Sequence, residues 1–207
     1  MSDIAQASCE NLPLADNSVD MIWTDPPYPT SYLKCYSWLA NEAARILKPG
    51  GFVFAMAGGY NLNKIFAMFE EVKGLNYFWE FHHRSNGDAP YIWPRFVVAK
   101  TKVILAYSKG FGLPRIKSVL SIFESTSKSK QWHHWGQDIE SARYYIDCFS
   151  KPGDLVVDPF IGGGTTGICC ELIKRRWIGF DIDPAALTTT SLRLSGAEIP
   201  LQIGMML

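Results

Sequence analysis

The sequence predicts an α/β fold, in which a largely parallel sheet carries helices on both faces and an antiparallel hairpin at one edge. Short apolar segments of strand length alternate with segments of helical periodicity, which is typical of parallel sheets. Two β-rich segments follow one another in the middle of the chain, which favours a hairpin there. The 207 residues, 47% hydrophobic and 19% charged, suffice for the core of one domain and are too few for two ordinary ones.

In the first half of the chain, the first predicted strand covers residues 19–23. It must end before Pro26 and Pro27, because consecutive prolines cannot continue a ladder of hydrogen bonds. Apolar residues then recur at helical spacing from Tyr36 to Leu47, and a Lys-Pro-Gly-Gly stretch ends that helix. The next predicted elements are a strand at 52–56, a helix at 61–72 and the two β-rich segments at 77–82 and 102–107.

In the second half, residues 109–135 form the least regular region, and helical spacing resumes at 139–149. The remaining predicted elements are a strand at 155–157, a tight loop at 162–164, a helix at 165–174, a strand at 177–180 and a helix at 184–194. The sequence contains no repeat and no low-complexity block. We therefore interpret residues 1–207 as a single domain.

Two of the predicted strands end in unusual loops. Residues 25–28 read Asp-Pro-Pro-Tyr, and residues 158–166 read Asp-Pro-Phe-Ile-Gly-Gly-Gly-Thr-Thr. Each loop has a carboxylate at the end of the strand and an aromatic residue close behind it. Ligands of open α/β sheets bind at the carboxyl ends of the strands, so both loops are candidate parts of one site. We call residues 25–28 the proline loop and residues 158–166 the glycine loop.

The glycine loop has the composition of a cofactor-binding turn. Three consecutive glycines permit positive φ angles and close approach of a ligand, and the helix that follows presents free N–H groups. Residues 162–167 match Gly-x-Gly-x-x-Gly, and Asp181 ends the next strand where a ribose-binding carboxylate belongs. The alternatives are a nicotinamide or flavin cofactor, or a plain strand-to-helix turn in which Asp181 and Asp183 cap the last helix.

The proline loop is suited to holding an amino group on a flat aromatic base. The carboxylate of Asp25 and the carbonyl of Pro26 would accept hydrogen bonds from the two N–H groups, and the ring of Tyr28 would stack on the base. The alternative is a structural proline turn with an ordinary core tyrosine.

The pairing of residues 24–28 with residues 158–166 resembles the amino-methyltransferases of DNA, and the order of the two loops resembles the circularly permuted β group of that family. Further matching segments are residues 17–20, 47–51, 151–154 and 175–183, so the resemblance covers most of the chain. It implies a Rossmann-like methyltransferase sheet and S-adenosylmethionine as the cofactor. Two positions depart from the family pattern: Ser8 replaces an acid that is frequent near the cofactor adenine, and residues 132–137 replace His-Pro and Lys-Pro elements.

The resemblance also implies roles for individual residues. Asp181 would hold the ribose hydroxyls of the cofactor, and Ile182 would pack on its adenine. The target base would be held by the proline loop, that is by Asp25, Pro26, Pro27 and Tyr28. The methionine side of the cofactor would be lined by Asp158, Phe160, Gly162, Gly163, Gly164, Thr165 and Thr166.

Methylation of adenine N6 in flipped-out DNA is the activity that the resemblance favours, because the proline loop opens with Asp and not Ser. Cytosine N4 is the main alternative, since both amines make the same hydrogen bonds. An RNA or protein-glutamine methyltransferase is less favoured, as is an inactive regulatory module that binds the cofactor. Carbon-5 cytosine chemistry is disfavoured, because the chain has no Pro-Cys dipeptide to supply its nucleophile. Such enzymes act in restriction-modification systems.

The DNA partner has to be recognised by local charge, because the formal net charge is zero. A target-recognition segment is expected at about residues 110–136, in or beside a basic stretch with one acid, Glu124; a solvated lysine face is the alternative. The cations of that stretch are Lys100, Lys102, Lys109, Arg115, Lys117, Lys128 and Lys130. This region is short, so a homodimer or a partner subunit is a further expectation. Aromatic residues that would wall the base pocket or pack the hairpin are Trp79, Phe81, Tyr91, Trp93 and Phe96.

Several classes of protein are disfavoured. No apolar run reaches the ~20 residues of a membrane span, and residues 1–15 lack the pattern of a signal peptide. The five cysteines form no Cys-x-x-Cys pair, which favours a reduced, cytoplasmic protein. The histidine pairs at 82–83 and 133–134 have no cysteine at zinc spacing, so no metal site is expected.

Overall fold

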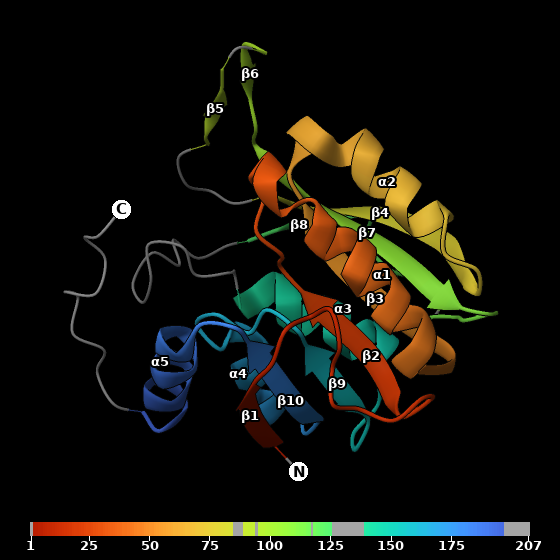
Figure 1. Ribbon diagram of the computed structural model, residues 1–207, viewed down its shortest axis with the longest axis vertical. Coiled ribbons are helices and arrows are strands. Elements are labelled where there is room, and N and C mark those ends of the chain that lie inside the picture. Colours follow the sequence, from red (N-terminus) through yellow and green to blue (C-terminus); the bar gives the residue numbers. More distant parts are fainter. Residues whose placement is uncertain (1, 85–88, 94, 117, 126–138, 197–207) are drawn as a thin grey trace.

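The computed structural model describes residues 2–84, 89–93, 95–116, 118–125 and 139–196 (Figure 1). Its helices are α1 (Lys34–Ile46), α2 (Leu62–Glu70), α3 (Ile139–Phe149), α4 (Thr165–Leu172) and α5 (Pro184–Leu194), with short 3-10 turns η1 (Thr30–Tyr32) and η2 (Gly59–Asn61). Its strands are β1 (Ser2–Gln6), β2 (Val19–Thr24), β3 (Leu47–Ala57), β4 (Leu75–Arg84), β5 (Tyr91–Ile92), β6 (Val97–Val98), β7 (Thr101–Lys109), β8 (Ile122–Glu124), β9 (Leu155–Asp158) and β10 (Arg176–Asp181).

Within the described residues, eight strands form one sheet in the order β1-β10-β9-β2-β3-β7-β4-β8. The first five strands of this order are parallel, and β7 is antiparallel to both β3 and β4. The predicted α/β class, the mostly parallel sheet and the antiparallel hairpin are therefore confirmed. The hairpin is not the outermost part of the sheet, because β8 pairs with β4 on its far side.

The structure differs from the sequence prediction at β1 and at the start of β3. β1 was not expected, because residues 2–6 read Ser-Asp-Ile-Ala-Gln, which has no strand periodicity, and they pair with one strand only. The stretch 48–51 was expected to be a turn after the helix, but it already belongs to β3. Gly50 has φ +82°, and the pairing of β2 with β3 is irregular between Val19 and Met21, so β3 starts with a distorted segment.

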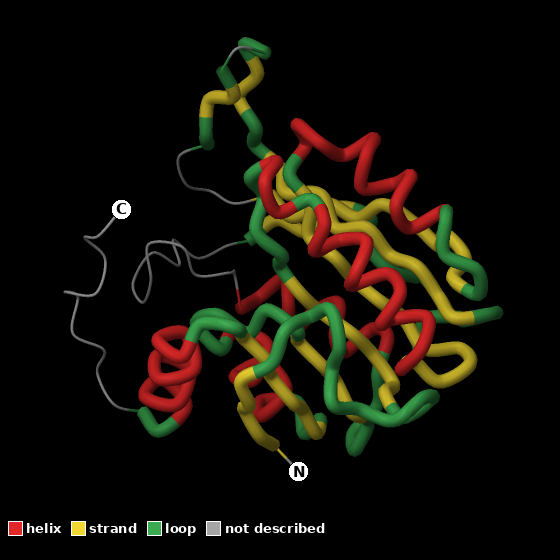
Figure 2. Tube along the Cα trace, in the orientation of Figure 1, coloured by secondary structure: helices red, strands yellow, loops and turns green. Residues whose placement is uncertain are grey.

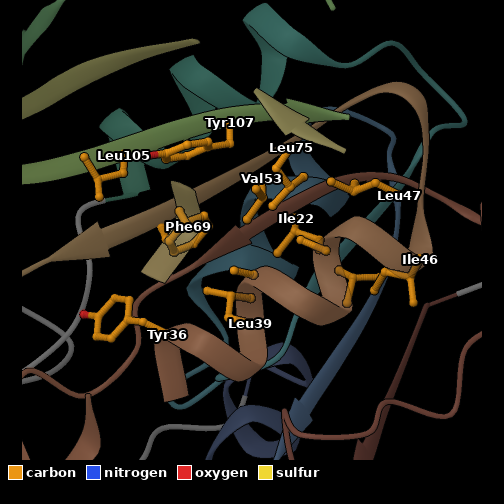
Figure 3. Close-up of a cluster of buried hydrophobic side chains, with 14 of the residues drawn as sticks. Ile22, Tyr36, Leu39, Ile46, Leu47, Val53, Phe69, Leu75, Leu105 and Tyr107 are labelled. Atoms are coloured by element: carbon orange, nitrogen blue, oxygen red, sulfur yellow. The ribbon is translucent and has the colours of Figure 1, made fainter. Parts of the chain in front are cut away.

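Helices cover both faces of the sheet (Figure 2), and a cluster of buried apolar side chains lies on each face. The first lies under α1 and α2, where Leu39 and Phe69 pack in one cluster with Ile22, Val53 and Leu105 of the strands (Figure 3). The second lies under α3 and α4 on the other face and includes many of the buried aromatic side chains. Strands covered on both faces explain why β2 and β9 are almost entirely apolar.

The parallel strands bring the two predicted loops to one edge of the sheet. β10, β9 and β2 are neighbours, so Asp181, the glycine loop and the proline loop follow one another along their carboxyl ends. β7 runs the other way, and Ala57 at the end of β3 is opposite Val103 near the start of β7. The first residues of β7 therefore lie at the same edge, which we call the loop edge.

Candidate active site

A buried carboxylate joins the two loops. The side chain of Thr24, the last residue of β2, donates to Asp158 Oδ1 at 2.6 Å. Thr166 Oγ1 donates to Asp158 Oδ2 at 2.5 Å, and the Phe160 amide donates to Oδ1 at 3.0 Å. Asp158 is 1% exposed. Asp158 therefore fixes the proline loop against the glycine loop. Its oxygens accept hydrogen bonds from protein donors and are shielded from solvent.

The surroundings of Asp158 make its ionisation costly. Burial raises the pKa of this carboxyl group to about 6, against the opposing effect of its three hydrogen bonds, and the negative charge of Asp25 raises it further. The folded state therefore binds more protons than the unfolded state between pH about 4 and about 6. The contribution of this group to folding stability falls as pH rises through that window and is constant above it.

The Asp158→Asn variant is expected to lose this pH dependence while keeping the isosteric bridge, since its amide can donate to the Thr166 hydroxyl. Relative to the variant, the wild type should lose about 1–3 kcal/mol of unfolding free energy between pH ~4 and pH ~7. Urea unfolding of both proteins at several pH values, followed by tryptophan fluorescence, measures the difference. If the unfolding free energies of the two proteins change with pH in the same way, the pKa of Asp158 is not raised.

The glycine loop is shaped by positive φ angles and by contacts with α5. Gly162 and Gly164 have φ +49° and +78°, and a Cβ on Gly164 would lie 2.9 Å from Thr190 Cγ2. The Thr190 hydroxyl donates to the Gly162 carbonyl at 2.7 Å, and Arg193 Nη1 donates to the Gly163 carbonyl at 2.7 Å. The loop is thus anchored on α5 through its carbonyl groups.

Gly167, the third glycine of the Gly-x-Gly-x-x-Gly match, has a packing role. A Cβ on Gly167 would lie 3.0 Å from the ring of Trp177, so glycine there allows α4 to approach β10 closely. Close helix–strand packing is the role of this glycine in nucleotide-binding turns. Thr165 and Thr166 are buried at the start of the same helix, and Phe160 is half-buried.

Asp181, the last residue of β10, and Asp183, two residues later, have different hydrogen-bond partners. Asp183 caps α5 by accepting a hydrogen bond from the Ala185 amide at 2.9 Å, so the helix-cap interpretation is confirmed for this residue. Asp181 is not the cap: its two oxygens accept from the amides of Gly162 at 3.1 Å and Asp183 at 3.0 Å. Next to it, Ile182 is 71% exposed, which is unusual for a large apolar side chain.

The proline loop holds its carboxylate between a tyrosine and a lysine. The hydroxyl of Tyr28 donates to Asp25 Oδ1, and Lys102 Nζ lies 2.9 Å from Asp25 Oδ2. The same ammonium group lies 5.4 Å from the centre of the Tyr28 ring, within the range of a cation–π contact. Pro26 is buried and Pro27 half-buried, which fixes the backbone on both sides of the turn.

Tyr28 differs from a purely stacking residue. Its sequence context indicated a role for the ring alone, yet its hydroxyl orients Asp25. Burial raises the pKa of Tyr28 well above its ordinary value, and the negative charge and hydrogen bond of Asp25 raise it further, so the phenol stays protonated as a donor. The residue as a whole is 38% exposed, while its hydroxyl is bonded to Asp25 and its Cβ side packs against Gly58, where an added Cβ would lie 3.3 Å from Tyr28 Cβ.

Lys102 is a residue of the candidate site whose position sequence reasoning missed, as it missed Thr190 and Arg193. It was counted among cations that would face DNA phosphate, but it pairs with Asp25. Two more of that set contact residues at the opposite edge of the sheet: Lys109 donates to Asn17 Oδ1 at 2.7 Å and Arg115 pairs with Asp147 at 3.1 Å. A lysine near the start of an otherwise apolar strand, 101–109, was the available signal.

The remaining sequence predictions have mixed outcomes. Phe81 lies in the core, whereas Trp79, Tyr91, Trp93 and Phe96 are exposed. Of the expected target-recognition segment, residues 117 and 126–136 lie outside the described residues, as does the strip 132–137. Across the part of the chain that the structure describes, no group of three His, Cys, Asp or Glu side chains could hold a metal ion. No described helix has the length and apolar character to cross a bilayer.

The sequence profile of the DNA methylase family matches residues 19–191, a span that includes both loops and Asp181. A similar protein is the type II methyltransferase M.HpaI of Haemophilus parainfluenzae, which is 27% identical over 223 residues. That alignment covers 87% of this chain and 69% of M.HpaI.

Two solved structures have the same architecture. The M1.HpyAVI–SAM complex superposes with a TM-score of 0.74 at 25% identity, over 94% of this chain and 99% of that one. The cytosine-N4-specific PvuII DNA methyltransferase superposes with a TM-score of 0.78 over 99% of this chain and 89% of its own, and at 19% identity this likeness concerns the fold alone. The fold is that of the Rossmann-like methyltransferases, with the proline loop before the glycine loop.

Proposed function

This chain belongs to the DNA methylase family that modifies adenine N6 or cytosine N4 with S-adenosylmethionine, and from that premise we propose that it methylates adenine N6 in DNA. The observation that carries the proposal is the position of Asp25. Its carboxylate is held by Tyr28 and Lys102 at the loop edge, and Thr24 beside it is bonded to Asp158 of the glycine loop. A base amine and a cofactor bound at the two loops would therefore be neighbours.

The residues at the glycine loop fit the cofactor. Asp181 lies half-exposed at the end of β10, and we assign it as the acceptor for the ribose hydroxyls. Ile182 offers an exposed apolar surface for the adenine ring. The positive φ angles of Gly162 and Gly164 let a methionine group approach the backbone. When bound, S-adenosylmethionine supplies a methyl group that is activated by its sulfonium centre.

The residues of the proline loop act on the base. We assign Asp25 and the Pro26 carbonyl as acceptors for the two N–H groups of the target amine, which favours a nitrogen lone pair aimed at the methyl group. The amine becomes cationic as it attacks, so these acceptors stabilise the transition state more than the ground state. The methylated amine then gives up its extra proton, which Asp25 is positioned to receive and pass to water.

Adenine is the proposed base because the proline loop opens with aspartate. The product decides between the two amines. Plasmid DNA from a methylation-deficient host is incubated with the protein and labelled S-adenosylmethionine, digested to nucleosides and analysed by mass spectrometry. N6-methyladenine supports the proposal, N4-methylcytosine changes the assigned base, and no labelled nucleoside contradicts DNA methylation.

The Tyr28→Phe variant is expected to transfer methyl groups about tenfold more slowly than the wild type. It keeps the ring but removes the hydrogen bond to Asp25, and a bond to a charged group is worth about 1.5–3 kcal/mol. The single-turnover rate on methylatable DNA measures the effect. Tyr32→Phe, a change in an exposed tyrosine of η1, is the matched control and should leave the rate unchanged. Equal rates for Tyr28→Phe and the control would remove the hydroxyl from the mechanism.

A further inference from the structure

A small hairpin projects from the loop edge beyond the sheet (Figure 1). It consists of β5 and β6, which pair Tyr91 with Val98 and Ile92 with Val97, and the Ala99 amide closes its base by donating to the Pro90 carbonyl at 2.9 Å. The chain continues from β6 into β7, whose second residue, Lys102, binds Asp25. The hairpin is therefore attached to the strand that holds the catalytic carboxylate.

The described surface of the hairpin is aromatic and exposed. Trp93 and Phe96 are 70% and 67% exposed, and Tyr91, Val97 and Val98 are exposed as well. The rings of Trp93 and Phe96 lie edge to face, with their centres 4.9 Å apart. Phe96 has φ +56°, an uncommon conformation for a bulky residue. A clustered apolar surface of this kind marks a site of interaction with a partner.

The charge of the hairpin points to a polyanion as that partner. Residues 89–102 contain Arg95, Lys100 and Lys102 and no acidic residue. Lys102 is engaged by Asp25, but Lys100 is exposed. The Arg95 guanidinium lies 4.9 Å from the centre of the Tyr60 ring, in the turn that follows β3. This contact ties the hairpin to the segment that begins at Gly58, against which Tyr28 packs.

We propose that this hairpin is a DNA-contacting arm: Trp93 and Phe96 stack on bases of the duplex beside the target base, and Lys100 contacts the backbone phosphates. Exposed aromatic side chains next to cations are suited to stacking on bases, and apolar wedges enter duplexes where bases unstack. The arm would hold open the stack from which the target base is withdrawn toward Tyr28. The inference rests on the proposed function, because it takes DNA as the substrate.

The test replaces both aromatic residues with alanine. Trp93→Ala/Phe96→Ala should bind unmethylated duplex DNA at least about tenfold more weakly than the wild type, because each base stack is worth roughly a factor of ten. With 2-aminopurine at the target position of a methylatable duplex, the wild type should raise its fluorescence and the variant should not. The affinity for S-adenosylmethionine, measured by calorimetry, should be unchanged and shows that the variant is folded.

A matched control is available on α4. Leu172 ends α4 and is 61% exposed, so Leu172→Ala removes an exposed apolar side chain that belongs neither to the arm nor to the expected target-recognition segment. Its DNA affinity should equal that of the wild type. Lys100→Ala gives an independent measurement: the slope of log affinity against log salt should flatten by about one, as for a lost phosphate contact.

DNA affinity of the double variant within about twofold of the wild type would overturn the proposal. If the same variant also changes from dimer to monomer in sedimentation, the hairpin contacts a second copy of the chain instead of DNA. The binding measurements need no catalysis. A wild type that binds DNA through the arm but methylates no base would therefore contradict the proposed function and not the arm.

Discussion

Asp25→Ala is expected to reduce the single-turnover rate of methyl transfer by about 10²–10³-fold or more, with little change in the affinity for S-adenosylmethionine. The carboxylate accepts a hydrogen bond from an amine that becomes cationic only as the methyl group is transferred, so its loss falls on the chemical step. The cofactor side is separate, because the partners of Asp25 are Tyr28 and Lys102 and the glycine loop is held by Asp158, Thr190 and Arg193.

A second acid, near the opposite end of β2, provides the control for Asp25. Asp20 pairs with Lys48 at 2.6 Å, much as Asp25 pairs with Lys102 at 2.9 Å. Asp20→Ala removes a comparable ion pair and a hydrogen bond to the Leu155 amide, so it should lower the stability and leave the rate per folded molecule unchanged. Rates are measured by quenched-flow methylation of labelled duplex, and affinities by calorimetry. Near-wild-type turnover of Asp25→Ala would remove this carboxylate from the chemistry.

The parts of the fold that the sequence predicted well are those with strong local signals. The strands β2, β9 and β10 are largely buried, so each is a compact apolar run, and α5 begins and ends where its proline and spacing indicated, at Pro184 and Leu194. β1 and β8 were missed because they are short strands at the two edges of the sheet. Their pairing depends on partners distant in sequence and leaves no periodic pattern of its own.

The candidate site shows the same division. The proline and glycine loops were found from composition and from their places at strand ends. The contact between Lys102 and Asp25 was not, since it joins residues 77 positions apart and depends on β7 running antiparallel to β3. The charge of Lys102 was evident from the sequence, but the edge of the sheet at which it lies was set by strand direction. Likewise, nothing local distinguishes Asp181 from Asp183, which lie two residues apart and have different hydrogen-bond partners.

Asp181→Ala is expected to weaken the binding of S-adenosylmethionine by more than tenfold. The carboxylate is proposed to accept hydrogen bonds from two ribose hydroxyls, and a bond to a charged group is worth about 1.5–3 kcal/mol. It also accepts from the Gly162 amide at 3.1 Å, so its removal loosens the glycine loop against β10 as well. Asp181→Asn retains an acceptor for that amide but removes the charge, and it should lie between the wild type and the alanine variant.

Asp183 separates a cofactor-binding role for Asp181 from a structural one. Asp183→Ala removes the N-cap of α5, which should cost about 1 kcal/mol of folding stability, while the cofactor affinity of the folded protein stays near that of the wild type. The opposite pattern is expected for Asp181→Ala, with a large loss of affinity and a smaller effect on stability. Titration calorimetry and urea unfolding of the two variants measure both quantities. If the two substitutions change affinity equally, both acids act through the loop and helix that they support, and the ribose contact of Asp181 is wrong.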